Sequence, residues 1–128
     1  MSEQKLSGQS ALVTGANSGI GKAVAIALAD AGANVVINYV SHPEDADAVV
    51  LEIKNKGGKA IAIKADVSNE SEVQQRFKEA ISTFGTLDIL VNNAGLQKDS
   101  PFVDMSLADW QLVMNVNLTG QFLCAREA

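Results

Sequence analysis

The chain has 128 residues, of which 47% are apolar and 20% charged, and its formal net charge is −5. This length suits one α/β domain with a real core and excludes two domains, while the composition excludes a disordered or membrane-spanning chain. Fifteen acidic against ten basic residues argue against nucleic acid as a partner, and one cysteine with one histidine excludes a disulfide within the chain or a four-ligand zinc site.

Four apolar runs predict the strands of a parallel sheet. They cover residues 11–13, 35–37, 60–63 and 87–91, and each has the apolar composition of a strand buried on both faces. Segments with helical periodicity separate them, which predicts a Rossmann-type, doubly wound α/β fold. Successive right-handed crossovers around a central first strand predict the strand order 3-2-1-4.

The helical segments carry apolar stripes that we expect to face the sheet. In the first segment the stripe is Ile20, Val24, Ala27, Leu28 and Ala31; in the third it is Val73, Phe77, Ala80, Ile81 and Phe84. Glycines follow the expected helix ends, where a left-handed residue turns the chain back: Gly32, Gly57-Gly58 and Gly85. Asn69 and Ser106 each precede an acidic residue by three positions, which is the spacing of a helix-starting capping box.

A glycine-rich turn at residues 14–21 links the first strand to the first helix. Glycine suits a backbone that passes against a diphosphate, because a Cβ has no room there and φ is often positive. The helix that begins near Ser18 would aim free N–H groups at the anion. Gly15, Gly19 and Gly21 follow G-x-x-x-G-x-G rather than the common G-x-G-x-x-G. The turn predicts a nucleotide site, and a tight turn without a ligand is the alternative.

Two more motifs follow predicted strands at the same sheet edge, where doubly wound sheets bind ligands. Asp66, next to Val67, could accept a hydrogen bond from an adenine amino group or could cap the helix that begins near Asn69. The residues alone leave both roles open. Asn92-Asn93 could pin neighbouring strand ends through side-chain hydrogen bonds, and Ala94-Gly95 leaves space for a ribose.

Taken together, these motifs resemble the short-chain dehydrogenase/reductase family. The chain carries T-G-x-x-x-G-I-G at 14–21, D-V at 66–67, N-N-A-G at 92–95 and N-L-T-G at 117–120, in the family's order. Stretches at 35–39, 105–110 and 117–123 resemble its bacterial glucose 1-dehydrogenase branch in particular. The resemblance implies an NAD(P)-dependent oxidoreductase that interconverts a secondary alcohol, a sugar among the candidates, and a carbonyl by hydride transfer.

The same resemblance implies a role for each matching residue. Those around the pyrophosphate are Gly15, Ser18, Gly19, Ile20 and Gly21. Asp66 and Val67 lie at the adenine, and Asn92, Ala94 and Gly95 lie beside the adenosine ribose. Asn117 is the catalytic asparagine, which in the family holds a water that links the catalytic lysine to solvent. Without the family, Asn117 would be a polar residue on a mostly apolar helix.

Tyr39 and Asn17 occupy positions that bear on the choice between NAD(H) and NADP(H). An aspartate at the end of the second strand would bind the adenosine hydroxyls, whereas a basic residue would pair with a 2′-phosphate. Tyr39 stands there instead, and Asn17 stands in the turn where strict NADP enzymes often carry a base. Because no acid repels a 2′-phosphate, and Ser41 or His42 could meet it, we expect NADP(H) or use of both cofactors.

The residues for proton transfer are missing from these 128 positions. The family needs a serine on the next strand and then Tyr-x-x-x-Lys, but Tyr39 is the only tyrosine and Pro43 stands four positions later. Hydride transfer must be matched by proton transfer at the alcohol oxygen, and a tyrosine does this near neutral pH only beside a cation. We expect a single dinucleotide-binding domain, incomplete at its C-terminus and inactive alone. A non-catalytic nucleotide-binding module and an inactive truncated fragment are the alternatives.

The remaining expectations concern location and partners. The polar start, residues 2–5, lacks a secretory signal pattern and predicts a cytoplasmic protein without a membrane partner. The resemblance implies a small-molecule substrate and a homo-oligomer, usually a tetramer, with segment 110–128 at the interface. We expect His42 to be a solvated loop residue and Cys124 to be a small core or interface side chain.

Overall fold

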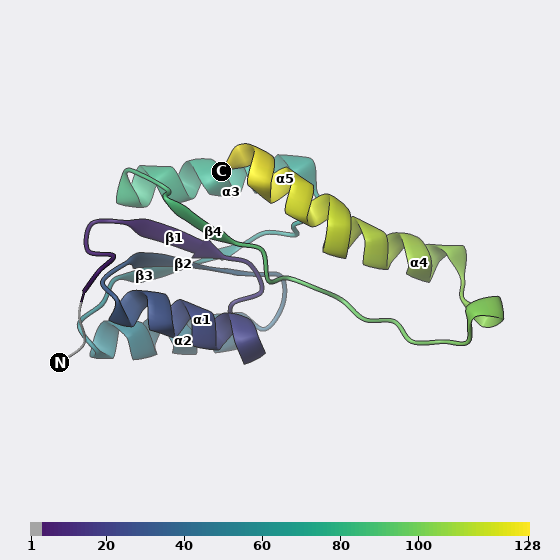
Figure 1. The fold of residues 1–128 in the computed structure, drawn as a ribbon, viewed down its shortest axis with the longest axis horizontal. Helices are drawn as coiled ribbons and strands as arrows, with labels where there is room; N and C mark the ends of the chain where they lie inside the picture. The colour runs from purple at the N-terminus through teal and green to yellow at the C-terminus, as the bar shows by residue number, and fades with distance from the viewer. Residues whose placement is uncertain (1–3) are drawn as a thin grey trace.

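A parallel sheet of four strands forms the centre of the fold (Figure 1). The computed structural model describes residues 4–128, so residues 1–3, on which the cytoplasmic prediction partly depends, lie outside it. The strands are β1 (Ser10–Val13), β2 (Asn34–Tyr39), β3 (Ala60–Lys64) and β4 (Ile89–Val91). Their order is β3-β2-β1-β4 and every pairing is parallel, which confirms the predicted Rossmann-type topology.

Helices cover both faces of this sheet (Figure 1). On one face lie α1 (Gly19–Asp30) and α2 (Pro43–Asn55); on the other lie α3 (Glu70–Phe84) and the C-terminal helix. The C-terminal helix comprises α4 (Leu107–Met114), a π-helical turn η2 (Asn115–Thr119) and α5 (Gly120–Glu127). A short 3-10 turn, η1 (Phe102–Asp104), precedes it. Figure 1 shows α5 beside α3, whereas α4 and the loop before it project beyond the sheet.

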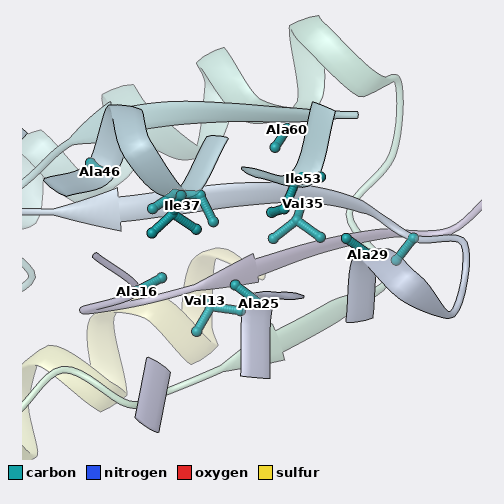
Figure 2. Close-up of a cluster of buried hydrophobic side chains, with 11 residues drawn as sticks. Val13, Ala16, Ala25, Ala29, Val35, Ile37, Ala46, Ile53 and Ala60 are labelled. Carbon is teal, nitrogen blue, oxygen red and sulfur yellow. The ribbon is translucent and has the colours of Figure 1, made fainter. Parts of the chain in front are cut away.

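The core has two parts, one on each face of the sheet. Because side chains alternate along a strand, Val13, Val35 and Ile37 face α1 and α2 (Figure 2), while Leu12 and Val36 face α3 and α5. The central strands β1 and β2 are almost wholly buried, as predicted. The prediction was wrong for β3 and β4, which lie at the sheet edges and are only partly buried.

Strand β4 also begins two residues later than predicted. Asp88, inside the predicted run, uses its carboxylate to accept a hydrogen bond from the Ser10 backbone at 2.9 Å. Its own backbone N–H donates to the Ser10 carbonyl at 2.9 Å. Asp88 therefore anchors the start of β4 to β1 but lies outside the regular strand.

Helix α1 buries a different face from the predicted one. Gly21, Ala25 and Ala29 are its buried residues, whereas Ile20 is 77% exposed. Val24 and Leu28 are only partly buried against the core. The helix comes so close to the turn before it that a Cβ on Gly21 would lie 2.5 Å from the Gly15 carbonyl oxygen. Small residues therefore face inward, and the larger apolar ones lie at the sides.

The predicted helix signals agree better with the structure. In α3, Val73, Phe77 and Ala80 are buried as expected, although Ile81 is 45% exposed. The side chains of Asn69 and Ser106 each accept a first-turn N–H at 3.1 Å. Left-handed glycines follow α1, α2 and α3, as predicted: Gly32, Gly57 and Gly85. Between residues 4 and 128, no helix has both the length and the apolar character needed to cross a bilayer.

Candidate functional site

A cleft of about 510 Å³ opens where the chain leaves the carboxyl ends of the strands. Many of its lining residues come from the predicted motifs: Gly15, Asn17, Ser18, Asp66, Val67, Ala94 and Gly95. The fold therefore brings three distant segments of sequence to one edge, as the motif positions predicted. Leu112 and Val116 of the C-terminal helix add an apolar wall that the sequence reasoning did not include.

The glycines of the turn at 14–21 differ in what surrounds them. Gly15 and Gly19 have φ of +62° and +57°, a left-handed conformation that favours glycine. Cβ atoms on Gly15 and Gly21 would collide with the N-N-A-G segment, at 3.1 Å from Ala94 Cα and 2.4 Å from Asn93 Nδ2 respectively. A Cβ on Gly19 would meet nothing within 4 Å. Gly15 and Gly21 thus allow the turn to pack, and Gly19 faces open space.

The N-termini of α1 and α2 have no side-chain cap, unlike those of α3 and α4. Ser18 is the N-cap residue, but its side chain accepts no hydrogen bond from the first turn. Asn69 and Ser106 do accept such bonds in α3 and α4. The amides at the start of α1 therefore lack a side-chain cap and point to where an anion can bind. Ile20 lies on this first turn and is exposed.

Thr14 and Asn93 fasten the turn to the end of β4. The Thr14 hydroxyl accepts from the Asn93 and Ala94 backbone amides at 2.9 and 2.8 Å. Asn93 Nδ2 donates to the Thr14 and Gly15 carbonyls at 3.1 and 3.2 Å. This confirms that an asparagine pins neighbouring strand ends. Sequence reasoning missed Thr14, although a hydroxyl at the end of a buried strand signals a hydrogen bond. Asn92 is half-buried and lies outside the lining of the cleft.

The loop after β2 lines the same cleft as the N-N-A-G segment. Val40 and Ser41 line it, whereas Tyr39 packs against the core beneath α1 and α2. Asn17 Nδ2 donates to the Ser41 carbonyl at 2.8 Å. His42 is exposed, as expected, and is the N-cap residue of α2 with a φ of +60°.

Asp66 and Val67 line the cleft from the end of β3. Asp66 Oδ1 accepts from the Ser68 backbone and hydroxyl at 2.9 and 2.7 Å, so it orders a local turn. It is not the cap of α3, because Asn69 has that role. Val67 lies under the C-terminal helix, where a Cβ on Gly120 would come within 2.7 Å of Val67 Cγ2. Of the two roles left open for Asp66, the structure therefore excludes the helix cap.

Asn117 lies within the π-helical turn η2, which the sequence reasoning did not predict. Its side chain accepts from the Leu96 N–H at 2.8 Å and donates to the Leu96 carbonyl at 2.9 Å. This pair fixes the chain directly after Gly95. Asn117 also borders a second cavity of about 330 Å³, on whose wall lie Trp110 and Met114. Turns of this type are rare and often occur at functional sites.

Comparison with known proteins assigns the family. A family model described as short chain dehydrogenase matches residues 9–128. The chain belongs to the short-chain dehydrogenase family. It is 52% identical over 121 residues to a 3-oxoacyl-[acyl-carrier-protein] reductase of Synechocystis, covering 94% of this chain and 49% of the relative. It is 47% identical over 124 residues to glucose 1-dehydrogenase 2 of Bacillus subtilis, covering 96% and 48%. The chain thus spans about half the length of these curated relatives.

Solved structures of the family share the fold of this short-chain dehydrogenase chain. A short chain dehydrogenase from Burkholderia cenocepacia, determined in complex with NADP, superposes with a TM-score of 0.94 and 41% identity. The match covers 97% of this chain and 51% of that one. These findings confirm the family and the Rossmann-type fold predicted from the motifs, and they include the glucose dehydrogenase branch named there.

Two charged or titratable groups near this short-chain dehydrogenase site have perturbed pKa values. Burial raises the pKa of the Cys124 thiol to about 11, so the group stays protonated and is a core side chain. A hydrogen bond to Glu70 raises the pKa of Arg126. This ion pair joins α5 to the first turn of α3. Neither group lines the cleft: Cys124 is buried in the core, and Arg126 is exposed.

Proposed function

We propose that this chain forms the cofactor-binding part of an NAD(P)(H)-dependent oxidoreductase that interconverts a secondary alcohol and a carbonyl. The names of two relatives, a 3-oxoacyl reductase and a glucose dehydrogenase, concern different substrates. The proposal therefore stops at the carbonyl and alcohol pair and does not choose between an acyl and a sugar substrate.

One observation carries the proposal: the uncapped start of α1 and the open space at Gly19 meet at the cleft edge. Free first-turn amides with the positive end of the helix dipole favour a diphosphate. Gly19 leaves its approach clear, since a Cβ there would point into open space. The NADP complex of the Burkholderia relative, which shares this fold, adds support.

The residues present fit a dinucleotide laid across the carboxyl edge of the sheet. Ser18, Gly19 and Ile20 would bind the diphosphate through the first turn of α1. The adenine would lie between Asp66-Val67 and the loop after β2, and Ala94 and Gly95 would leave room for a ribose. When bound, the cofactor supplies or accepts the hydride. Asn117 then positions the segment after Gly95 through its pair of hydrogen bonds to Leu96.

We propose further that residues 1–128 bind cofactor but turn over no substrate. Proton transfer at the alcohol oxygen needs an acid of suitable pKa, and Tyr39 packs into the core on the far side of β2 from α3. No Tyr-x-x-x-Lys occurs in these residues. The proton donor would then come from outside this stretch, in keeping with relatives about twice as long.

For the cofactor, we propose NADP(H) or use of both forms. The adenosine ribose would lie near Asn17, Val40 and Ser41, which line the cleft and are uncharged. A 2′-phosphate would meet no carboxylate among these lining residues, and the Ser41 hydroxyl can donate to it.

Nucleotide binding is tested by titration calorimetry with NADPH and NADH on the folded chain. The matched variants are Gly19→Val and Gly85→Val, since both glycines are left-handed and face open space, but Gly85 lies at the end of α3. We expect micromolar-range binding that Gly19→Val weakens at least tenfold and Gly85→Val leaves intact. No heat with either nucleotide would sink the proposal. Clear alcohol oxidation by this chain would refute the claim of inactivity.

A further inference from the structure

Asparagine side chains link the strand ends at the carboxyl edge of the sheet. Asn93 ties the end of β4 to the glycine turn, and Asn38 Nδ2 lies 3.4 and 3.3 Å from the Ile63 and Ala65 carbonyls of the β3 end. Asn17 adds a third link, between the turn and the loop after β2. The first two links are buried or partly buried, whereas the Asn17 link is exposed.

Residues 40–42, which we call the ribose loop, follow β2 directly, and this stretch of chain is bonded to the turn at two points, one in β2 and one in the ribose loop. At the inner point the Ala16 N–H donates to the Asn38 carbonyl at 3.0 Å, and both residues are buried. The outer point is the bond of 2.8 Å from Asn17 Nδ2 to the Ser41 carbonyl, across 24 positions of sequence. Breaking the outer bond would free the ribose loop without disturbing the core.

We propose that Asn17 is a positioning residue that holds the ribose loop against the glycine turn and so shapes the adenosine end of the cleft. Asn17 and Ser41 both line the cleft, so the bond directly joins two segments of its lining, the glycine turn and the ribose loop. The bond also occupies the Ser41 carbonyl, whose oxygen would repel a 2′-phosphate if it turned inward. This inference depends on the proposed nucleotide site, but the bond itself does not.

The consequence for binding is a loss confined to the adenosine half of the cofactor. In Asn17→Ala the ligand itself must order the ribose loop. The free-energy cost of this ordering reduces the affinity. A single neutral hydrogen bond accounts for about a three- to tenfold change in affinity. Adenosine 2′,5′-bisphosphate contains the adenosine half without the nicotinamide. We therefore expect Asn17→Ala to weaken this ligand and NADPH by the same factor.

The experiment combines calorimetry with hydrogen exchange on three variants. Asn17→Leu and Asn17→Ala both remove the donor, and the leucine keeps the branched arrangement of side-chain heavy atoms. Ser106→Ala is the matched control, because it also removes one exposed side-chain bond of similar length, 3.1 Å, at the start of α4. We expect both Asn17 variants to show the affinity loss and faster exchange of the ribose-loop amides without ligand. Ser106→Ala should show neither change.

The outcomes separate this inference from the proposed function. If ribose-loop exchange in the unliganded Asn17 variants equals that of the parent chain, the positioning role is wrong whatever the ligands do. A loss for NADPH that spares the bisphosphate would also overturn it. If the parent chain binds neither ligand, the proposed function fails and the effect on affinity fails with it, while hydrogen exchange still decides whether Asn17 holds the loop.

Discussion

At the scale of single residues, Thr14 is a sharp test because one conservative substitution removes several hydrogen bonds. Its buried hydroxyl accepts from two backbone amides, those of Asn93 and Ala94, and lies 3.4 Å from the Val91 carbonyl. Thr14→Val keeps the shape but takes the acceptor from the Ala94 amide and leaves the Asn93 amide with the Val91 carbonyl alone, at 3.1 Å. We expect a loss of about 2–3 kcal/mol in the free energy of unfolding, measured by urea denaturation.

Thr14→Ser is the control for this change, since it keeps the hydroxyl and removes only a methyl group. It should cost about 1 kcal/mol. Equal stability of the valine variant and the parent chain would mean that water and the Val91 carbonyl satisfy the two amides and that Thr14 does not fasten β4 to the turn.

The buried thiol of Cys124 gives a dependence of stability on pH. Burial raises its pKa from the ordinary 9.0 to about 11, so the unfolded chain loses this proton first as the pH rises. The thiol's contribution to stability is complete below pH 9 and declines as the pH approaches 11. We expect the advantage in melting temperature of the parent chain over Cys124→Ala to shrink across this interval. A constant difference between pH 8 and 11 would contradict the prediction.

The identities of the residues predicted where polar side chains lie together at the sheet edge. They did not always predict which hydrogen-bond partners these side chains have. The N-N-A-G motif correctly indicated an asparagine that pins strand ends, because two amides after a buried strand must find partners. The partner of Asn93, Thr14, comes from 79 positions earlier in the chain and was not predicted. Asp66 was ambiguous for a similar reason, since a carboxylate before a helix can cap it or order the preceding turn.

At the level of elements, Gly120 determines how closely the C-terminal helix approaches the cleft. A Cβ there would lie 2.7 Å from Val67 Cγ2 and 3.3 Å from the Val67 carbonyl oxygen. Gly120→Ala must push apart α5 and the segment after β3, which we expect to cost about 1–3 kcal/mol. Denaturant unfolding measures the loss. Thr119→Ala, an exposed neighbour, should stay within about 0.5 kcal/mol of the parent chain.

Because Val67 lines the cleft, the same substitution should also weaken nucleotide binding. Unchanged stability in Gly120→Ala would show that the helix shifts freely and that the contact does not set its position.

Two features of the helices were not predictable from periodicity. In α1 the stripe of larger apolar residues has the right spacing, but the close approach to the turn selects Gly21, Ala25 and Ala29 for the buried face. The π-helical turn at Asn117 contains an extra residue compared with an α-helical turn. A hydrophobic pattern with a period of 3.6 residues does not encode it. Each feature is accompanied by a tertiary contact. The buried face of α1 contacts the glycine turn, and Asn117 of the π-helical turn bonds to Leu96.

For the whole molecule, strand order followed from general rules and loop geometry did not. Right-handed crossovers and apolar alternation suffice for the order β3-β2-β1-β4, and this order alone brings the motifs to one edge. The direction of the Tyr39 side chain depends on its position in strand β2. It points to the sheet face covered by α1 and α2, so that Ser41, and not Tyr39, lines the cleft. Cofactor choice therefore depends on features that strand and helix patterns do not contain.

The C-terminal helix presents the clearest prediction for the whole chain, namely self-association. Trp110, Leu118 and Phe122 are 51%, 59% and 57% exposed along it, and exposed apolar surface of this kind marks an interface. We propose a second copy of the chain as the partner, in line with the expected homo-oligomer.

Light scattering should give a mass that rises with concentration. Trp110→Glu with Leu118→Glu should keep the chain monomeric, because an interface would bury both charges. Leu51→Glu, equally exposed at 59% on α2, should associate like the parent chain. If the parent chain stays monomeric at high concentration, the proposal is wrong. Other parts of a longer protein would then cover this surface.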